Sequence, residues 1–109
     1  MSRVRVEDLR LRPIKRRERS FEYALRDELA KMGVMFVKLK PTITGFPDRL
    51  AIGACNMKLI ETKAEDGEPS EGQRVLHEKI LRDQGVEVIV VKRNVRVAAL
   101  QIYSALRER

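Results

Sequence analysis

The sequence has very little of several residue types on which common kinds of site depend. Its 109 residues include one cysteine, Cys55, one histidine, His77, and no tryptophan. A single cysteine excludes an intramolecular disulfide, and one cysteine with one histidine excludes the Cys/His clusters that hold structural zinc. Because cytosolic proteins keep their thiols reduced, a lone cysteine indicates an intracellular setting.

Long apolar runs are also missing. No stretch approaches the about 18 apolar residues that a membrane-spanning helix needs, and the first residues lack the apolar region of a secretory signal. We therefore expect a soluble, cytoplasmic protein. A length of 109 residues suffices for one domain with one modest hydrophobic core.

Positive charge is abundant and concentrated near the N-terminus. Residues 1–20 hold eight arginines and lysines against three acidic residues, which accounts for most of the formal net charge of +7. We interpret residues 1–19 as a basic N-terminal arm, extended or mobile because Pro13 interrupts a continuous helix, and residues 20–109 as the folded domain. The expected partner is nucleic acid, with a solubilising tail or a lipid contact as alternatives. The candidate contacts in the arm are Arg12, Lys15, Arg16 and Arg17.

Hydrophobic periodicity and turn signals predict an α/β domain. Ser20 is the expected N-cap of the first helix, Ser70 and Gln73 form a capping box, and Gly85 ends the helix that follows. Residues 86–91 are apolar and mostly β-branched, so we expect their strand to be central in a mixed sheet with helices against its faces. The predicted elements are a helix over 20–32, strands over 34–39, 48–52 and 57–63, a helix over 70–84, a strand over 86–92 and a helix over 95–107.

The stretch from Gly45 to Lys63 carries the candidate chemistry. Glu61 and Lys63 lie on the same side of one predicted strand because side chains alternate, and a hairpin would bring Asp48 beside Glu61. Two carboxylates with an adjacent ammonium suit Mg²⁺ or Mn²⁺ and predict hydrolysis of a phosphodiester bond. The alternative is a solvated Glu61–Lys63 pair and an aspartate that only begins a turn.

These motifs together resemble a known nuclease family. They occur in the order found in the VRR-NUC (virus-type replication-repair nuclease) family of the PD-(D/E)xK superfamily, over about residues 20–91. The resemblance implies a restriction-endonuclease-like αβββαβ(α) core. It also implies a metal-dependent endonuclease that cuts DNA, above all branched or junction DNA, in replication, repair or recombination in phage or prokaryotes. The motifs are Gly45-x-Pro47-Asp48, Glu61-x-Lys63 and Ser70-Glu71-x-Gln73.

The resemblance also implies a role for each matched residue. Asp48 and Glu61 would bind Mg²⁺, for which Mn²⁺ would substitute, with help from the Thr62 carbonyl. Lys63 would position the attacking water. Glu22 matches a family glutamate that joins the acidic cluster through metal-bound water.

Several of these residues have an alternative explanation. Glu22 is also an acid favourably placed at a helix N-terminus, and Glu28 borders the same apolar stripe. Gln73 has its capping duty beside the role implied by the resemblance, which is to reach toward the water or the scissile phosphate. Lys38 and Lys40 would face the same way near the site and contact phosphate, unless they are only exposed.

His77 lies one helical turn beyond Gln73, where it would approach DNA, although a surface histidine without a chemical duty is the simpler reading. The acidic loop over 64–69 departs from the neutral or basic rim usual in the resembled family.

The last expectations concern the oligomeric state and the functions that compete with a DNA nuclease. Paired cuts across a junction require two copies, so we expect a homodimer, formed through Ile102 and Tyr103 of the last helix or through the arm around Leu9 and Leu11. A non-catalytic nucleic-acid-binding module and a nuclease acting on RNA are the competing functions.

Overall fold

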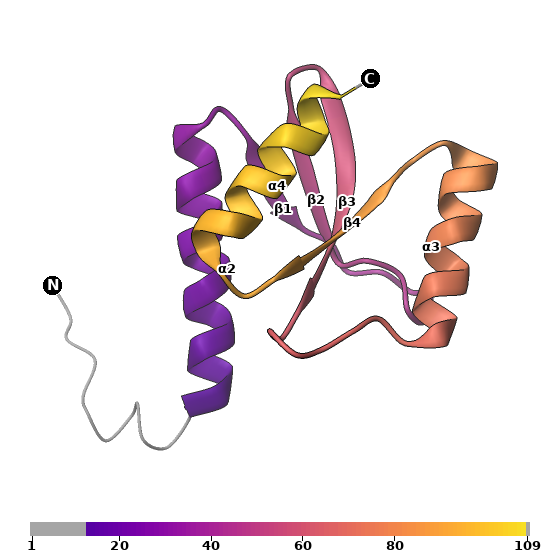
Figure 1. Cartoon of the computed structure of the whole chain (residues 1–109), viewed down its shortest axis with the longest axis horizontal. Helices are drawn as coiled ribbons and strands as arrows, with labels where there is room; N and C mark the ends of the chain where they lie inside the picture. Colours follow the sequence, from indigo (N-terminus) through magenta and orange to yellow (C-terminus); the bar gives the residue numbers. More distant parts are fainter. Residues whose placement is uncertain (1–12, 109) are drawn as a thin grey trace, which may run out of the picture.

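The computed structural model describes residues 13–108, and the side chains of residues 20–108. Within this range the chain forms one mixed four-stranded sheet with the strand order β1-β2-β3-β4. The pairs β1–β2 and β2–β3 are antiparallel, and β3–β4 is parallel. The elements are α2 (Pro13–Lys31), β1 (Met35–Lys38), β2 (Arg49–Gly53), β3 (Asn56–Lys63), α3 (Glu71–Gln84), β4 (Val88–Lys92) and α4 (Val95–Arg107) (Figure 1).

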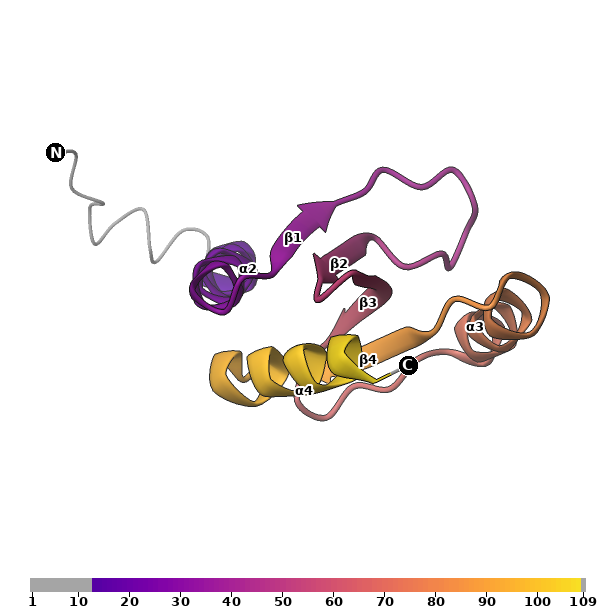
Figure 2. The same ribbon diagram turned by 90° about the horizontal axis from the view of Figure 1, so that it is seen from above.

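The helices flank the sheet on both sides. Helices α2 and α4 lie on one side and α3 on the other, as both Figure 1 and Figure 2 show. The α/β class, the mixed sheet and the order of elements are therefore confirmed. No described helix is long and apolar enough to cross a membrane.

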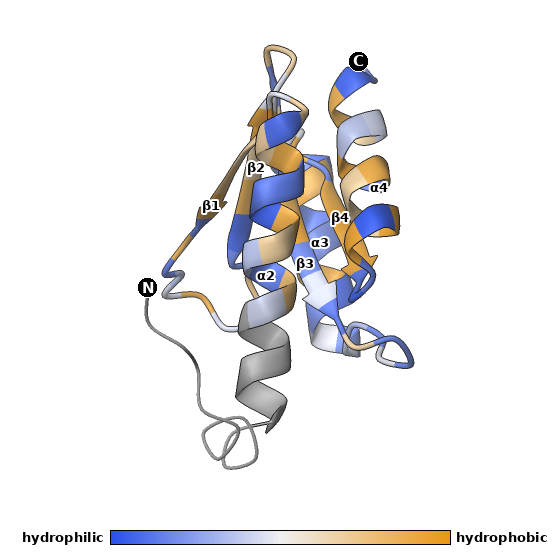
Figure 3. Ribbon diagram, turned by 90° about the vertical axis from the view of Figure 1, so that its left-hand side faces the viewer, coloured by the Kyte–Doolittle hydropathy of each residue, from blue (hydrophilic) through white to orange (hydrophobic). Residues whose placement is uncertain are grey.

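The main core lies between the sheet and the α2–α4 layer. Ile60 pairs with Arg49 and with Ile89 in register, so these three residues face the same side of the sheet. In Figure 3 much of the sheet is apolar, whereas α2 alternates between apolar and hydrophilic residues, as expected for a helix with one buried side. The fully buried residues that form this core include Leu25, Leu29, Ala51, Ile60, Val91, Ala98, Ala99 and Ile102.

The first helix begins seven residues earlier than the sequence predicts. Helix α2 starts at Pro13, not at Ser20, so residues 13–19 are helical rather than extended. Proline is tolerated in the first turn of a helix, because the amide hydrogen it lacks would have no partner there. Pro13 therefore opens the helix and does not interrupt it. Residues 1–12, which contain Leu9, Leu11 and Arg12, lie outside the described residues.

Two other expectations are corrected by the packing. Strand β4 lies at the end of the described sheet and not at its centre, and its apolar run is explained by contacts with both α4 and α3. Ile102 is fully buried in the core of the single chain, so it does not form a surface for a second copy. Tyr103 is partly buried against the same core.

The caps of α3 are as predicted. Ser70 is the N-cap, its hydroxyl accepts from the Gln73 amide at 3.1 Å, and the Gln73 side chain accepts from the Ser70 amide at 2.9 Å. Gly85 ends the helix in the left-handed conformation, with φ +71°. These bonds fix where α3 begins, which is beside the loop that precedes β2.

The turn between β2 and β3 places two residues other than glycine in the left-handed region of backbone conformation. Ala54 and Cys55 have φ values of +52° and +59°, and they connect strands that pair up to Gly53 and Asn56. Two-residue hairpins of this kind favour asparagine and glycine, because the left-handed conformation is unfavourable for residues with a Cβ.

We predict that Cys55→Gly stabilises the fold. The change removes Cβ strain of about 1 kcal/mol at an exposed position, so the thermal midpoint measured by circular dichroism rises by several degrees. Ser104→Gly is the matched control, since it introduces glycine at an exposed helical position and lowers the midpoint. An unchanged or lower midpoint for Cys55→Gly contradicts the prediction.

Candidate active site

Asp48 and Glu61 meet at one end of the sheet. Arg49 pairs with Ile60 in the antiparallel ladder of β2 and β3. The next residues toward the end of the sheet are Asp48 and Glu61, which therefore lie opposite each other. The Asp48 carbonyl accepts a hydrogen bond of 2.7 Å from the amide of Leu39, which ties it to the end of β1. The hairpin predicted from the sequence therefore brings the two carboxylates together.

The loop before Asp48 holds it in place. Pro47 is fully buried, and Gly45 adopts φ +83°, a conformation that favours glycine. A Cβ on Gly45 would lie 3.6 Å from the Gln73 side chain, so the loop packs against the start of α3. The Gly45-x-Pro47-Asp48 motif thus sets the position of its aspartate through backbone conformation and burial.

Glu61 and Lys63 form the predicted pair on β3. Their charged atoms, Oε2 and Nζ, are 3.7 Å apart, and their side chains are 12% and 22% exposed. Burial raises the pKa of Glu61 above its ordinary value of 4.5, and Asp48 adds to the rise, while Lys63 opposes it. A further cation at this point would relieve the unfavourable ionisation of Glu61.

Arg49 is the site residue that sequence analysis missed. Its side chain is 5% exposed, and its guanidinium forms ion pairs with Glu22 and, at 2.9 Å, with Asp48. It also donates to the Asp48 carbonyl at 3.1 Å. Its position in the sequence could have revealed it, because an arginine on the apolar face of a strand needs a partner for its buried charge, and Asp48 is its neighbour.

The charged groups form a continuous row around the end of the sheet. Glu22 on α2 contacts Arg49, Arg49 contacts Asp48, Asp48 faces Glu61, and Glu61 contacts Lys63. Glu22 therefore joins the acidic cluster through Arg49, from the opposite side of the sheet.

His77 on α3 extends the row beyond Lys63. Burial lowers the pKa of its imidazole, and the charge of Lys63 lowers it further, which places the two near each other. Its Nε2 is buried without a hydrogen-bond partner. Its contact with DNA stays a prediction.

The remaining predicted residues lie around this row or outside it. Gln73 is engaged in the capping box, and its role at the site stays a prediction. Thr62 lies between Glu61 and Lys63 and pairs with Val91. Lys38 lines a cavity on the α2 side, and Lys40 is exposed. The residues Lys15, Arg16 and Arg17 belong to α2, but their side chains lie outside the description.

The acidic loop over 64–69 is held by β4. Lys92 forms an ion pair of 3.3 Å with Glu68 and donates to the Gly67 carbonyl. Part of the loop's negative charge is therefore balanced within the chain.

The donor set at the site fits Mg²⁺ and not zinc. Among the described side chains, those of residues 20–108, no group of three or more histidines, cysteines, aspartates or glutamates is arranged to hold a metal ion. Mg²⁺ needs fewer protein ligands, because it keeps several waters and binds through one or two carboxylates. Asp48 and Glu61 would supply those two. The carboxylates of Asp48 and Glu22 are both paired with Arg49, and Asp48 is the one that lies opposite Glu61.

A search of family models found no match to this chain, and a search of curated proteins found none similar enough to count as a relative. The resemblance to VRR-NUC nucleases therefore stands on the motifs quoted above.

We predict that Glu61→Gln stabilises the metal-free protein at neutral pH. The folded state raises the pKa of Glu61, so it binds more protons than the unfolded state, and ionisation of Glu61 lowers stability as the pH rises above about 4.5. Removing the charge should raise the thermal midpoint at pH 7 in the presence of EDTA. The advantage should shrink at lower pH, where Glu61 is protonated in both states.

Glu65→Gln is the matched control, since Glu65 is exposed in the acidic loop. This substitution should leave the thermal midpoint unchanged. A Glu61→Gln variant that is less stable than the wild type at pH 7 would show that the pair with Lys63 outweighs the cost of burial.

Proposed function

We propose that this protein is a divalent-metal-dependent endonuclease that hydrolyses phosphodiester bonds in DNA. The observation that carries the proposal is Glu61, a nearly buried carboxylate with a raised pKa that lies opposite Asp48 and 3.7 Å from Lys63. A carboxylate whose pKa is shifted by burial and by a specific charged partner is a candidate for a functional site. The alternative, a solvated Glu61–Lys63 pair, does not agree with side chains that are only 12% and 22% exposed.

The arrangement of elements supports the same proposal. The order helix, three strands, helix, strand, helix agrees with the αβββαβ(α) core expected of a PD-(D/E)xK nuclease of VRR-NUC type. The positions of the three motifs on these elements support the proposal. Asp48 precedes β2, Glu61 and Lys63 end β3, and Gln73 opens α3.

The site residues divide the chemistry between them. Asp48 and Glu61 would hold Mg²⁺, which when bound supplies positive charge to a phosphoryl oxygen and makes a water molecule more acidic. Lys63, held beside Glu61, would orient the attacking water and offset negative charge that develops on the phosphate. Arg49 would keep Asp48 and Glu22 in place through its two ion pairs.

One observation favours a second function. Arg49 already neutralises Asp48 and Glu22 within the chain, as expected for a non-catalytic nucleic-acid-binding module whose acidic cluster is structural. The two functions differ in what Mg²⁺ does. A nuclease cuts plasmid, linear or branched DNA when Mg²⁺ or Mn²⁺ is added, and a binding module does not. The same assay with RNA tests the remaining alternative.

We predict that Lys63→Ala slows metal-dependent cleavage of DNA by on the order of 100-fold or more, because it removes a group that acts on the reacting water. The variant should fold and bind Mg²⁺ as the wild type does, as judged by circular dichroism and by the rise of the thermal midpoint on adding the metal. Asp48→Asn should instead weaken the binding of Mg²⁺.

Lys58→Ala is the matched control, because Lys58 lies on the same strand but forms its ion pair of 3.0 Å with Glu87, away from the acidic cluster. It should cut at the wild-type rate. Wild-type activity in Lys63→Ala, or no cleavage of any nucleic acid by the wild type with either metal, would overturn the proposal.

We also propose that the basic residues near the N-terminus supply affinity for DNA. Since α2 begins at Pro13, deleting residues 1–19 would cut this helix, so substitution is the sharper test. Replacing Lys15, Arg16 and Arg17 with glutamine should raise the dissociation constant for duplex DNA. It should also flatten the dependence of that constant on salt, because fewer counterions are released. Unchanged affinity and salt dependence would refute this role.

The preferred substrate and assembly follow from the resemblance. Branched or junction DNA would need two cuts, and the acidic cluster around Glu61 supports one, so a homodimer remains our proposal. Because Ile102 is buried, the surface for a second copy must lie elsewhere. On α4 the exposed apolar side chains are Val97 and Leu100, which are 50% and 52% exposed.

A further inference from the structure

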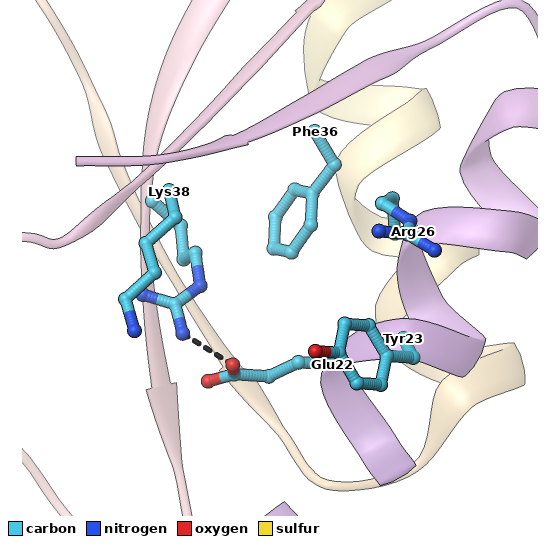
Figure 4. A pocket seen from close by; sticks show the side chains of 6 residues that line it. Glu22, Tyr23, Arg26, Phe36 and Lys38 are labelled. Atoms are coloured by element: carbon cyan, nitrogen blue, oxygen red, sulfur yellow. Dashed lines mark ion pairs between the residues drawn. The ribbon is translucent and has the colours of Figure 1, made fainter. Parts of the chain in front are cut away.

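A cavity of about 400 Å³ opens on the α2 side of the sheet, next to the row of charges but separate from the Glu61–Lys63 pair. This volume lies in the range of small-molecule sites, about 300–1,000 Å³. In Figure 4, Phe36 points from β1 into the space between Lys38 and Arg26, and Glu22 and Tyr23 lie across from it on α2. The cavity is lined by Glu22, Tyr23, Arg26, Phe36, Lys38 and Arg49.

Two aromatic rings reach the cavity from opposite elements. Phe36 comes from β1 and is partly buried against the core, so its position is fixed by packing. Tyr23 comes from α2 and is 55% exposed, so its ring is open to solvent beside the cavity. The pair offers two apolar faces of the kind on which nucleic-acid bases stack.

The charge of the lining is positive. It holds Lys38, Arg26 and Arg49 against a single acid, Glu22, and that acid is already paired with Arg49. Arg26 lies 5.0 Å from the centre of the Tyr23 ring and only 3.4 Å from the exposed Asp27, a pair that water screens. Lys38 and Arg26 thus leave net positive charge at the mouth, which suits a phosphate.

The cavity is also joined to the candidate active site. Arg49 lines it and pairs with Asp48, which lies opposite Glu61. The cavity and the Glu61–Lys63 pair lie on opposite faces of the sheet, and Arg49 and Asp48 connect them at its end. A strand whose phosphate lies at Asp48 and Glu61 would reach the cavity by passing round this end, with one nucleotide unpaired from its complement.

We propose that this cavity binds one unpaired nucleotide of the substrate strand, with its base against Tyr23 and Phe36 and its phosphate at Arg26 and Lys38. The inference deepens the proposed function, because it gives the nuclease a way to prefer DNA with a single-stranded or branched segment. Stacking of one base on an aromatic side chain favours such DNA over a plain duplex by on the order of tenfold.

The test measures binding without cleavage, in EDTA. The probe is a DNA duplex with a short single-stranded overhang that carries one 2-aminopurine, a base whose fluorescence falls when it stacks. The wild type should quench this probe and bind it on the order of tenfold more tightly than a blunt duplex. Tyr23→Leu should lose both effects, and Tyr23→Phe, which keeps the ring, should restore them.

Arg26→Ala should weaken the preference for the overhang, and Arg107→Ala is its matched control. Arg107 lies 5.3 Å from the centre of the Tyr103 ring on α4, so it forms the same kind of contact away from the cavity. Circular dichroism establishes that each variant folds. Quenching that is absent in the wild type, or equal in Tyr23→Leu and in the wild type, overturns the proposal.

A competition experiment distinguishes binding of a DNA strand from binding of a free nucleotide. Deoxyadenosine monophosphate should compete only weakly with the overhang probe, and competition as strong as that of an unlabelled overhang overturns the assignment to the substrate strand. Because the assay contains no divalent metal, its result is independent of catalysis. If Lys63→Ala cuts DNA at the wild-type rate but the wild type still quenches the probe, only the proposed nuclease activity is rejected. If Lys63→Ala slows cleavage but the wild type does not quench the probe, only the nucleotide site in the cavity is rejected.

Discussion

The buried guanidinium of Arg49 is the interaction on which the candidate site depends. It lies on the face of the sheet that carries the hydrophobic core, and it pairs with Glu22 on α2 and with Asp48 at the start of β2. A buried charge costs several kcal/mol unless it is paired, so both carboxylates are held where the guanidinium needs them. Removing either acid would leave Arg49 partly unpaired in the core, and removing Arg49 would leave Glu22 and Asp48 without their shared partner.

The register of the hairpin sets the rest of the geometry. Because Arg49 pairs with Ile60, Asp48 and Glu61 face the α3 side, while Arg49 and Ile60 face the α2 side. Asp48, directly before β2, and Arg49, its first residue, thus leave the backbone toward opposite faces, and their side chains still meet at 2.9 Å around the end of the sheet. A shift of one residue in the pairing of β2 with β3 would separate Asp48 from Glu61 and place Arg49 on the wrong face.

Much of this could be predicted from the sequence. The strands, the capping box at Ser70 and the extent of α4 follow from local signals, and the pairing of Asp48 with Glu61 follows from a short hairpin with a fixed register. The start of α2 was predicted wrongly because Pro13 is compatible with both a break and a first turn. The edge position of β4 was missed because an apolar strand covered on both faces looks the same at the centre and at the edge of a sheet. Arg49 was missed because its partners come from two distant segments, and no local pattern reports such a contact.

The hairpin tip described with the fold has a practical consequence for studying this molecule. Cys55 is the single cysteine of the sequence and is exposed at the tip. The strand that leads there from Asp48 spans five residues, about 16 Å at the usual rise per residue. A thiol-reactive dye would thus attach at one defined point, at the opposite end of β2 from the acidic cluster. The native chain can be labelled there for distance measurements without any substitution.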